Sequence, residues 1–166
     1  YIYRDANSSL NDTSDDFFYL ALDNSQYRLT YNGEYRAEHD IFLKIENISD
    51  SWHVTSKDGT RYNFTTRISS EYGYVSRWYI DDMTDASGNK IFYSYLLNPF
   101  FTDSNAVYLD KIEYNNERAR KVQLFYENSA RPDRRRVYKH GLLIEESRRL
   151  SAINISANNS SYISTR

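Results

Sequence analysis

Oxygen-bearing side chains are concentrated in one short stretch, where Asp81, Asp82, Asp85, Ser87 and Asn89 lie within nine positions. Carboxylate, hydroxyl and amide oxygens are the ligands that calcium takes in proteins. The run lacks the alternate-residue spacing and the distant glutamate of an EF-hand loop. It therefore favours a structural turn, in which the Asp85 carboxylate caps main-chain amides and Gly88 and Asn89 adopt positive φ.

Other arrangements that support catalysis are missing from the sequence. The three histidines, His39, His53 and His140, are far apart and show no metal-ligand spacing. The His39-Asp40 pair would be half of a catalytic dyad, but no nucleophile-elbow sequence accompanies it. The chain has no cysteine and no glycine-rich phosphate loop. We expect neither an enzyme nor a bound cofactor or metal.

A basic cluster in the second half raises the question of nucleic-acid binding. It contains Arg131, Arg134, Arg135, Arg136, Lys139, Arg148 and Arg149, flanked by Tyr126 and Tyr138. Arginines interleaved with aromatic residues are typical of single-strand binding surfaces. The isoelectric point near 5.9 argues against this function, and Glu145 and Glu146 are placed to pair with the arginines. The pattern favours a solvated hairpin or an interface edge, with no nucleic-acid partner.

Charge is unevenly distributed along the chain. Residues 1–50 carry a net charge of −6, and residues 115–150 carry +5. Such polarity has two interpretations: solvated faces of opposite sign, or surfaces that pair successive layers or an adjacent subunit.

Sequons for N-glycosylation are more frequent than chance predicts. With 15 Asn and 29 Ser plus Thr in 166 residues, about two to three Asn-x-Ser/Thr sequences are expected. The chain has seven, at Asn7, Asn11, Asn47, Asn63, Asn154, Asn158 and Asn159. The excess predicts a secreted chain from an organism that N-glycosylates, the alternative being sampling in an Asn- and Ser-rich sequence.

Composition and periodicity indicate the elements that carry these residues. The chain has 17 tyrosines, one methionine and five glycines, and tyrosine favours pleated, half-buried surfaces. Period-two alternation recurs, with turn residues about every ten to fifteen positions. The longest apolar runs, such as 17–22, are far too short to span a membrane. The sequence predicts an all-β fold, an antiparallel meander of hairpins.

The clearest hairpin has Trp52 on its first strand and Asp58-Gly59 at its turn, where Gly59 should have positive φ. A second unit of the same kind follows, in which Trp78 precedes a turn at residues 85–89. Tyr93 and Tyr95 then share one face of the returning strand. Because an open meander leaves two edges unpaired, we expect the isolated chain to be only marginally stable.

The ordered series of strands resembles a known family. It runs through residues 17–22 (FFYLAL), 27–29 (YRL), 42–45 (FLKI), 52–64 (WHVTSKDGTRYNF), 77–95 (RWYIDDMTDASGNKIFYSY), 108–114 (YLDKIEY), 122–127 (VQLFYE) and 149–155 (RLSAINI). This series is similar to the SpvB-like region that precedes the Rhs (YD) repeats in the B component of Tc insecticidal toxin complexes.

The resemblance implies a layer of a larger Rhs-type β shell or ribbon. It implies a non-catalytic wall segment of a secreted protein whose hollow shell encloses a toxic cargo. Residues 17–155 would be the hairpin layers, with extensions at 1–16 and at 156–166, the latter leading into further β structure. The partners would be flanking β layers of the parent chain, copies of the chain itself and an enclosed toxin cargo. Because the chain begins at Tyr1 rather than Met, we expect a processed or excised segment.

The sequons support a second hypothesis. An extracellular, N-glycosylated structural module would assemble into a filament, adhesin or surface coat, with its strand edges paired across subunits. It predicts occupied sequons, whereas the shell hypothesis predicts a sheet with one face that is not purely solvated.

Overall fold

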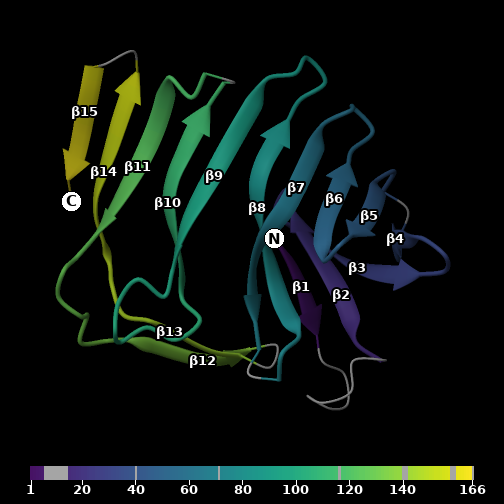
Figure 1. The fold of residues 1–166 in the computed structure, drawn as a ribbon, viewed down its shortest axis with the longest axis horizontal. Helices are drawn as coiled ribbons and strands as arrows, with labels where there is room; N and C mark the ends of the chain where they lie inside the picture. Colours follow the sequence, from purple (N-terminus) through teal and green to yellow (C-terminus); the bar gives the residue numbers. More distant parts are fainter. Residues whose placement is uncertain are drawn as a thin grey trace. The chain divides into compact units, whose positions relative to one another are not determined.

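The computed structural model describes residues 1–5, 15–39, 41–70, 72–115, 117–139, 142–157 and 160–165. Within these ranges the regular structure is β-strand, without a helix, which confirms the predicted all-β fold (Figure 1). The strands are β1 (Ile2–Asp5), β2 (Phe17–Leu22), β3 (Ser25–Tyr31), β4 (Tyr35–Ala37), β5 (Lys44–Ile48), β6 (Ser51–Thr55), β7 (Arg61–Ser69), β8 (Val75–Thr84), β9 (Lys90–Leu97), β10 (Val107–Tyr114), β11 (Arg120–Tyr126), β12 (Arg135–Lys139), β13 (Leu142–Glu146), β14 (Leu150–Ala157) and β15 (Ser160–Thr165).

The chain divides into two compact units. The first comprises Tyr1–Gly88 with His140–Leu142, and the second comprises Asn89–Lys139 with Leu143–Arg166. Each is described separately below.

The sheet of the first unit closes on itself. Strands β1 to β8 pair antiparallel in sequence order, and β1 pairs with both β2 and β8. Ile2 lies opposite Leu20 on one side and opposite Trp78 on the other. The expected open meander with two free edges is therefore wrong for this unit, because the short strand β1 closes the sheet into a barrel.

Alternation along the strands fills the interior of this barrel. One set of side chains points inward and forms a single core, while the residues between them point outward. Phe18 and Tyr35 pack against this core. The buried core residues are Ile2, Leu20, Leu29, Ile45, Trp52, Val54, Phe64 and Trp78.

The two tryptophans anchor this core. Their rings meet edge to face at a centroid distance of 5.9 Å, and the ring of Phe18 lies 5.1 Å from that of Trp52. The Trp78 indole N–H donates to the carbonyl of Asp50 at 2.7 Å. Such aromatic contacts add to the free energy gained by burial. Trp52 and Trp78, predicted as strand residues, are thus core residues of the barrel.

The Asp58-Gly59 hairpin forms as predicted between β6 and β7. Gly59 has φ of 88°, the left-handed region that glycine adopts without strain. The Asp58 carboxylate accepts bonds from the Thr60 amide and hydroxyl, both at 3.0 Å, and from the Ser56 hydroxyl. Bonds from the Ser56 hydroxyl and from Thr60 hold the pKa of Asp58 below its ordinary value.

The second unit is built on an antiparallel sheet in the order β9-β10-β11-β14-β15. The strands β12 and β13 form a separate two-stranded sheet. A bridge between Ser104 and Glu145 joins β13 to the loop that connects β9 and β10. The predicted last strand at residues 150–155 corresponds to β14, and β15 follows it.

Candidate interaction surface

The sheet of the second unit has two faces of opposite character. Residues directly opposite each other on neighbouring strands project from the same face. One row crosses four strands as Tyr93, Ile112, Val122 and Ile155. We call this side the apolar face. It also carries Ile91, Tyr95, Leu109, Tyr114, Leu124 and Ile153.

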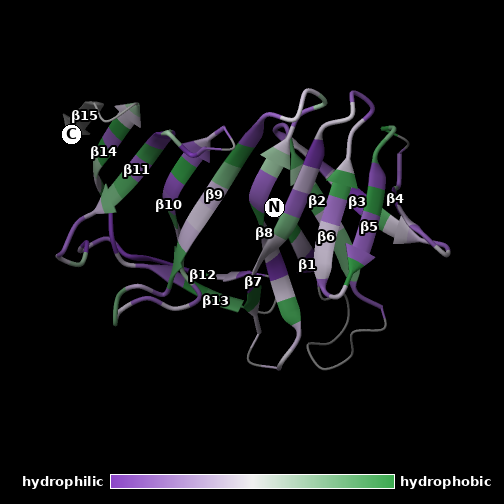
Figure 2. Ribbon diagram, turned by 45° about the horizontal axis from the view of Figure 1, so that its top comes forward, coloured by the Kyte–Doolittle hydropathy of each residue, from purple (hydrophilic) through white to green (hydrophobic). Residues whose placement is uncertain are grey.

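The opposite side, the polar face, carries mostly hydrophilic residues. One of its rows is Ser94, Lys111, Gln123 and Asn154. Figure 2 shows the resulting alternation as green and purple bands along β10, β11 and β14. Tyr93 and Tyr95 share the apolar face, as the sequence predicted.

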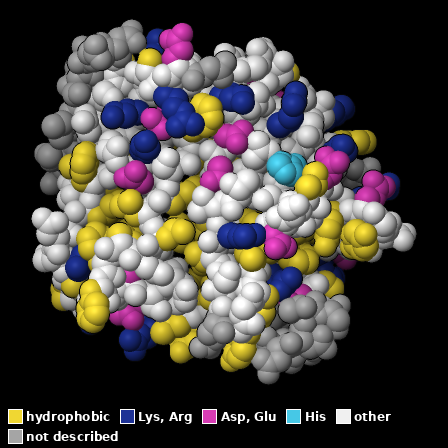
Figure 3. All heavy atoms as spheres, in the orientation of Figure 1, with side chains coloured by type: hydrophobic (Ala, Val, Ile, Leu, Met, Phe, Trp, Pro, Cys, Tyr) yellow, Lys and Arg dark blue, Asp and Glu magenta, His cyan; other side chains and the backbone are white. Residues whose placement is uncertain are grey.

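The apolar face lacks a buried core of its own. In the described residues of the second unit, the buried hydrophobic side chains are Ala106 and Tyr108, and neither lies in the row defined above. Tyr93, Ile112 and Val122 are half-buried, and Ile155 is exposed. Figure 3 likewise shows hydrophobic side chains reaching the molecular surface between polar ones. A sheet face of this kind is suited to contact with further polypeptide.

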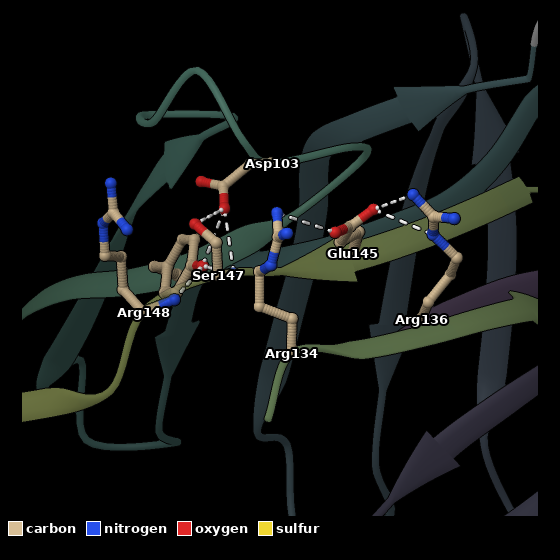
Figure 4. A network of polar contacts seen from close by, with 7 residues as sticks. Asp103, Arg134, Arg136, Glu145, Ser147 and Arg148 are labelled. Carbon is tan, nitrogen blue, oxygen red and sulfur yellow. Dashed lines mark hydrogen bonds and ion pairs between the residues drawn. The ribbon is translucent and has the colours of Figure 1, made fainter. Parts of the chain in front are cut away.

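A polar network fixes the β9–β10 loop beside this sheet (Figure 4). Asp103 Oδ1 accepts bonds from the Ser147 amide (3.0 Å), the Ser147 hydroxyl (2.6 Å) and the Tyr108 hydroxyl (3.1 Å). The Tyr108 hydroxyl in turn accepts from the amides of Ser147 and Arg148. Ser147 is completely buried, so these bonds satisfy groups that water does not reach. Sequence patterning gave no signal for this network, because its members are about 40 residues apart.

Two tyrosines of this region lie against each other. The rings of Tyr108 and Tyr126 meet edge to face at 4.7 Å, and the Tyr126 hydroxyl donates to the carbonyl of Leu109 at 2.7 Å. Burial raises the pKa of Tyr126 to about 12, assisted by the nearby Tyr108. Burial likewise raises the pKa of Tyr108. Both are structural residues, so Tyr126 is not a free stacking platform for a base.

Much of the basic cluster is neutralised within the unit. Arg134 and Arg136 both pair with the largely buried Glu145, at 3.2 Å and 2.9 Å. Figure 4 shows the two guanidinium groups on either side of this carboxylate. The predicted pairing with Glu145 is therefore confirmed, and these arginines are partly committed to the hairpin.

A second carboxylate holds two more arginines. Asp133 accepts from Arg131 at 2.8 Å and pairs with Arg149 at 2.5 Å. The bond from Arg131, followed by that from Arg149, holds the pKa of Asp133 well below its ordinary range. This cluster thus joins the β11–β12 connection to the start of β14.

The oxygen-rich run is divided among separate contacts in the first unit. Asp81 accepts bonds from the Thr66 amide and from the Thr65 hydroxyl, both at 2.7 Å, where the β7–β8 ladder is irregular. Asp82 accepts from the Asn63 amide group at 2.9 Å and 3.1 Å. Among the described residues, no group of three acidic or histidine side chains is arranged to hold a metal ion.

The predicted turn at residues 85–89 forms, whereas the capping of main-chain amides by the Asp85 carboxylate stays a prediction. Gly88 has φ of 85°, and its amide donates to the main-chain carbonyl of Asp85 at 3.0 Å. Asn89 does not have positive φ, and that part of the prediction is wrong. The bond from the Gly88 amide to Asp85 and the positive φ of Gly88 form the turn, and Asn89 directly precedes β9.

The sequons lie in different environments. Asn47 is exposed on β5. Asn63 is half-buried: its side-chain amide donates to Asp82, and its Oδ1 accepts from Nδ1–H of His53 at 2.7 Å. Asn154 is half-buried on β14. Asn7, Asn11, Asn158 and Asn159 lie outside the described residues, as does His140. Glycosylation stays a prediction at every sequon.

Comparison with known proteins gives one kind of match. No protein-family model matches the chain, and no curated protein matches its sequence. In the described part of the chain, no helix has the length and apolar character needed to cross a membrane.

Solved structures share the fold of the chain. The N-terminal domain of the effector protein SpvB from Salmonella typhimurium has a TM-score of 0.72 and 16% sequence identity, covering 98% of this chain and 78% of that domain. The Photorhabdus luminescens Tc holotoxin pore has a TM-score of 0.69 and 14% identity, covering 98% of this chain. The TcdB2-TccC3 complex has a TM-score of 0.68 and 15% identity, covering 98% of this chain.

These matches differ in how much of the other protein they cover. The chain corresponds to about 12% of the length of each Tc toxin chain. At these identities the likeness concerns the fold. The predicted resemblance is confirmed at that level: the chain has the fold of the SpvB N-terminal domain and of the corresponding region of Tc toxin chains.

Proposed function

We propose that this chain is a non-catalytic structural segment of a secreted, Rhs/Tc-toxin-like protein. It forms part of the wall of a hollow β shell, and the shell encloses a toxic polypeptide cargo. The observation that carries this proposal is the apolar face of the second unit, together with the fold shared with regions of Tc toxin chains. A wall that holds an unfolded polypeptide needs such a face, because an unfolded chain exposes apolar side chains.

The geometry allows a direct test in the full-length parent protein. A photo-crosslinking amino acid is placed at Tyr93 on the apolar face and, as the matched control, at Lys121 on the polar face. We expect Tyr93 to crosslink to peptides of the enclosed segment and Lys121 to give no such product. Crosslinks to that segment from Lys121 but not from Tyr93 would contradict the proposed orientation. If neither position gives a crosslink to the enclosed segment, the result would contradict an enclosed cargo.

A second candidate function is an extracellular, N-glycosylated module of a filament, adhesin or surface coat. The seven sequons favour it, and the exposed Asn47 gives it an accessible acceptor. Mass spectrometry of tryptic peptides from the source organism tests it. Glycan at Asn47 supports this function, and an unmodified Asn47 peptide as the dominant species argues against it.

A further inference from the structure

The wall of the first unit is split at one seam. Strands β4 and β5 are joined by a single residue pair, Tyr35 with Ile45, whereas β5 pairs with β6 along its whole length. A groove of about 1080 Å³ lies at this seam. It is lined by residues of the two flanking hairpins within 30–38 and 41–48.

In the part of the chain that the structure describes, the groove presents main-chain groups of β5 that have no strand beside them. In an antiparallel ladder, every second residue directs its N–H and C=O away from the partner strand. The side of β5 opposite β6 meets β4 only at Ile45, so the end of β5 near Ile48 is an open strand edge. Open edges accept an added strand.

The rim of the groove is both apolar and acidic. Tyr31 and Phe42 are each 67% exposed and Ile48 is 56% exposed. The carboxylates of Glu34, Glu38 and Glu46 also line the groove. Each of them forms an ion pair, but their side chains stay 61% (Glu34), 46% (Glu38) and 42% (Glu46) exposed. The surrounding segment 1–50 has a net charge of −6.

A second open edge in the chain has the complementary character. Strand β12 pairs with β13 alone in its two-stranded sheet, as far as the described residues extend. Its residue Arg135 is exposed, and Tyr138 is 78% exposed. The surrounding segment 115–150 has a net charge of +5. Within the described residues, strand β12 therefore has a strand beside it on one side only, and it carries the exposed Arg135 and an exposed aromatic ring.

We propose that strand β12 of a second copy of this chain adds to β5 in the groove of the first copy. The added strand completes the main-chain hydrogen bonds of β5, and Arg135 meets the acidic rim at Glu46. The contact joins two different surfaces, so each copy keeps one groove and one β12 strand free for further copies. The proposal does not depend on the proposed function, since it concerns strand edges that are open within the described residues of this chain.

Sedimentation velocity of the 166-residue chain at graded concentrations tests this inference. We expect reversible association that weakens as salt screens the opposite charges. Glu46→Lys and Arg135→Glu should each weaken association about tenfold. Lys121→Glu is the matched control, because it makes the same charge change as Arg135→Glu on the polar face of β11. It should leave association unchanged.

The decisive experiment mixes the two variants. A Glu46→Lys chain offers an intact β12 and a basic groove, and an Arg135→Glu chain offers an acidic β12 and an intact groove. The mixture should associate more strongly than either variant alone, because the reversed charges complement each other. Arg135 and Lys121 are exposed, and the Glu46 side chain is 42% exposed. Unchanged tryptophan fluorescence verifies the barrel in each variant, and unchanged far-UV circular dichroism verifies the remaining β-sheet. A wild-type chain that stays monomeric at every concentration overturns the proposal, as does a Lys121→Glu chain that loses association equally.

Discussion

At the scale of single residues, the glycine at the β6–β7 turn carries a conformational requirement that other residues do not meet. Gly59 has φ of 88°, and a side chain there would meet Ala86 at 3.4 Å. The neighbouring Asp58 is tied to Thr60 by two bonds, which fixes the turn from the other side.

Replacing this glycine gives the first prediction. Gly59→Val should lower the free energy of unfolding of the first unit by about 1–3 kcal/mol, because a β-branched residue is strained at positive φ. Gly59→Asn is the control and should cost less, since asparagine tolerates this region. Urea denaturation followed by tryptophan fluorescence measures both, because both tryptophans lie in the barrel core. Equal stability of the valine variant and the wild type would show that the turn does not constrain the barrel.

The second residue-scale prediction concerns pH. The pKa of Tyr126 is raised to about 12 in the folded chain, above about 10 for an unfolded tyrosine. The unfolded state therefore loses its proton first, so the stability that Tyr126 contributes is present below pH 10 and is lost as the pH rises toward 12. At pH 9, Tyr126→Phe should have a lower free energy of unfolding than the wild type, because it lacks the bond to Leu109. Between pH 9 and pH 11 it should lose less of that free energy than the wild type.

Far-UV circular dichroism in urea at the two pH values measures this difference. Tyr138→Phe is the matched control, because Tyr138 is largely exposed, and it should follow the wild type at both pH values. An identical loss of stability in wild type and Tyr126→Phe would contradict the assignment.

At the scale of elements, the strand β1 closes the barrel although it is only four residues long. Ile2 is completely buried and contacts strands on both sides. The importance of β1 for the barrel follows from its position between β2 and β8, and not from its length.

Truncation of this side chain gives the element-scale prediction. Ile2→Ala should cost about 2–5 kcal/mol of unfolding free energy, the usual range for a buried aliphatic side chain replaced by alanine. Ile48→Ala removes the same atoms at an exposed position and should change stability by less than about 0.5 kcal/mol. Urea denaturation monitored by tryptophan fluorescence compares them. Equal costs for the two variants would mean that β1 does not close the core.

The elements also show what sequence patterning resolves. The Asp58-Gly59 hairpin and the shared face of Tyr93 and Tyr95 are local, since a turn residue and a two-residue period specify them. The pairing of Ile2 with Trp78 spans most of the first unit, and alternation gives a residue's face but not its partner strand. Sequence patterning did not predict the Asp103 network for the same reason. The pairing of Glu145 could be predicted, because arginines of opposite charge lie near it in the sequence.

At the scale of the whole molecule, the two units differ in how they are stabilised. The first has a closed sheet around one aromatic and aliphatic core. The second has a sheet whose apolar face is half-buried and which is fixed by polar networks at one end. We therefore expect the second unit to be the less stable of the two; the marginal stability expected from the sequence stays a prediction.

This difference predicts two unfolding transitions in the isolated chain. Ellipticity of the β-sheet should begin to fall at lower urea concentration than tryptophan fluorescence, because fluorescence reports the barrel alone. Hydrogen exchange should correspondingly be faster in β11 and β14 than in β6 and β7. Coincident transitions by both probes would show that the two units unfold as one cooperative body.

The proposed role makes a claim about the size and chemistry of the natural protein. A shell wall requires a parent chain many times longer than this segment, whereas a coat module is complete at about its own size and carries sugar. The intact mass of the source-purified polypeptide, before and after glycosidase treatment, separates these cases. We predict a mass far above 19.7 kDa that glycosidase leaves unchanged. A polypeptide near 20 kDa that loses mass on treatment would contradict the shell.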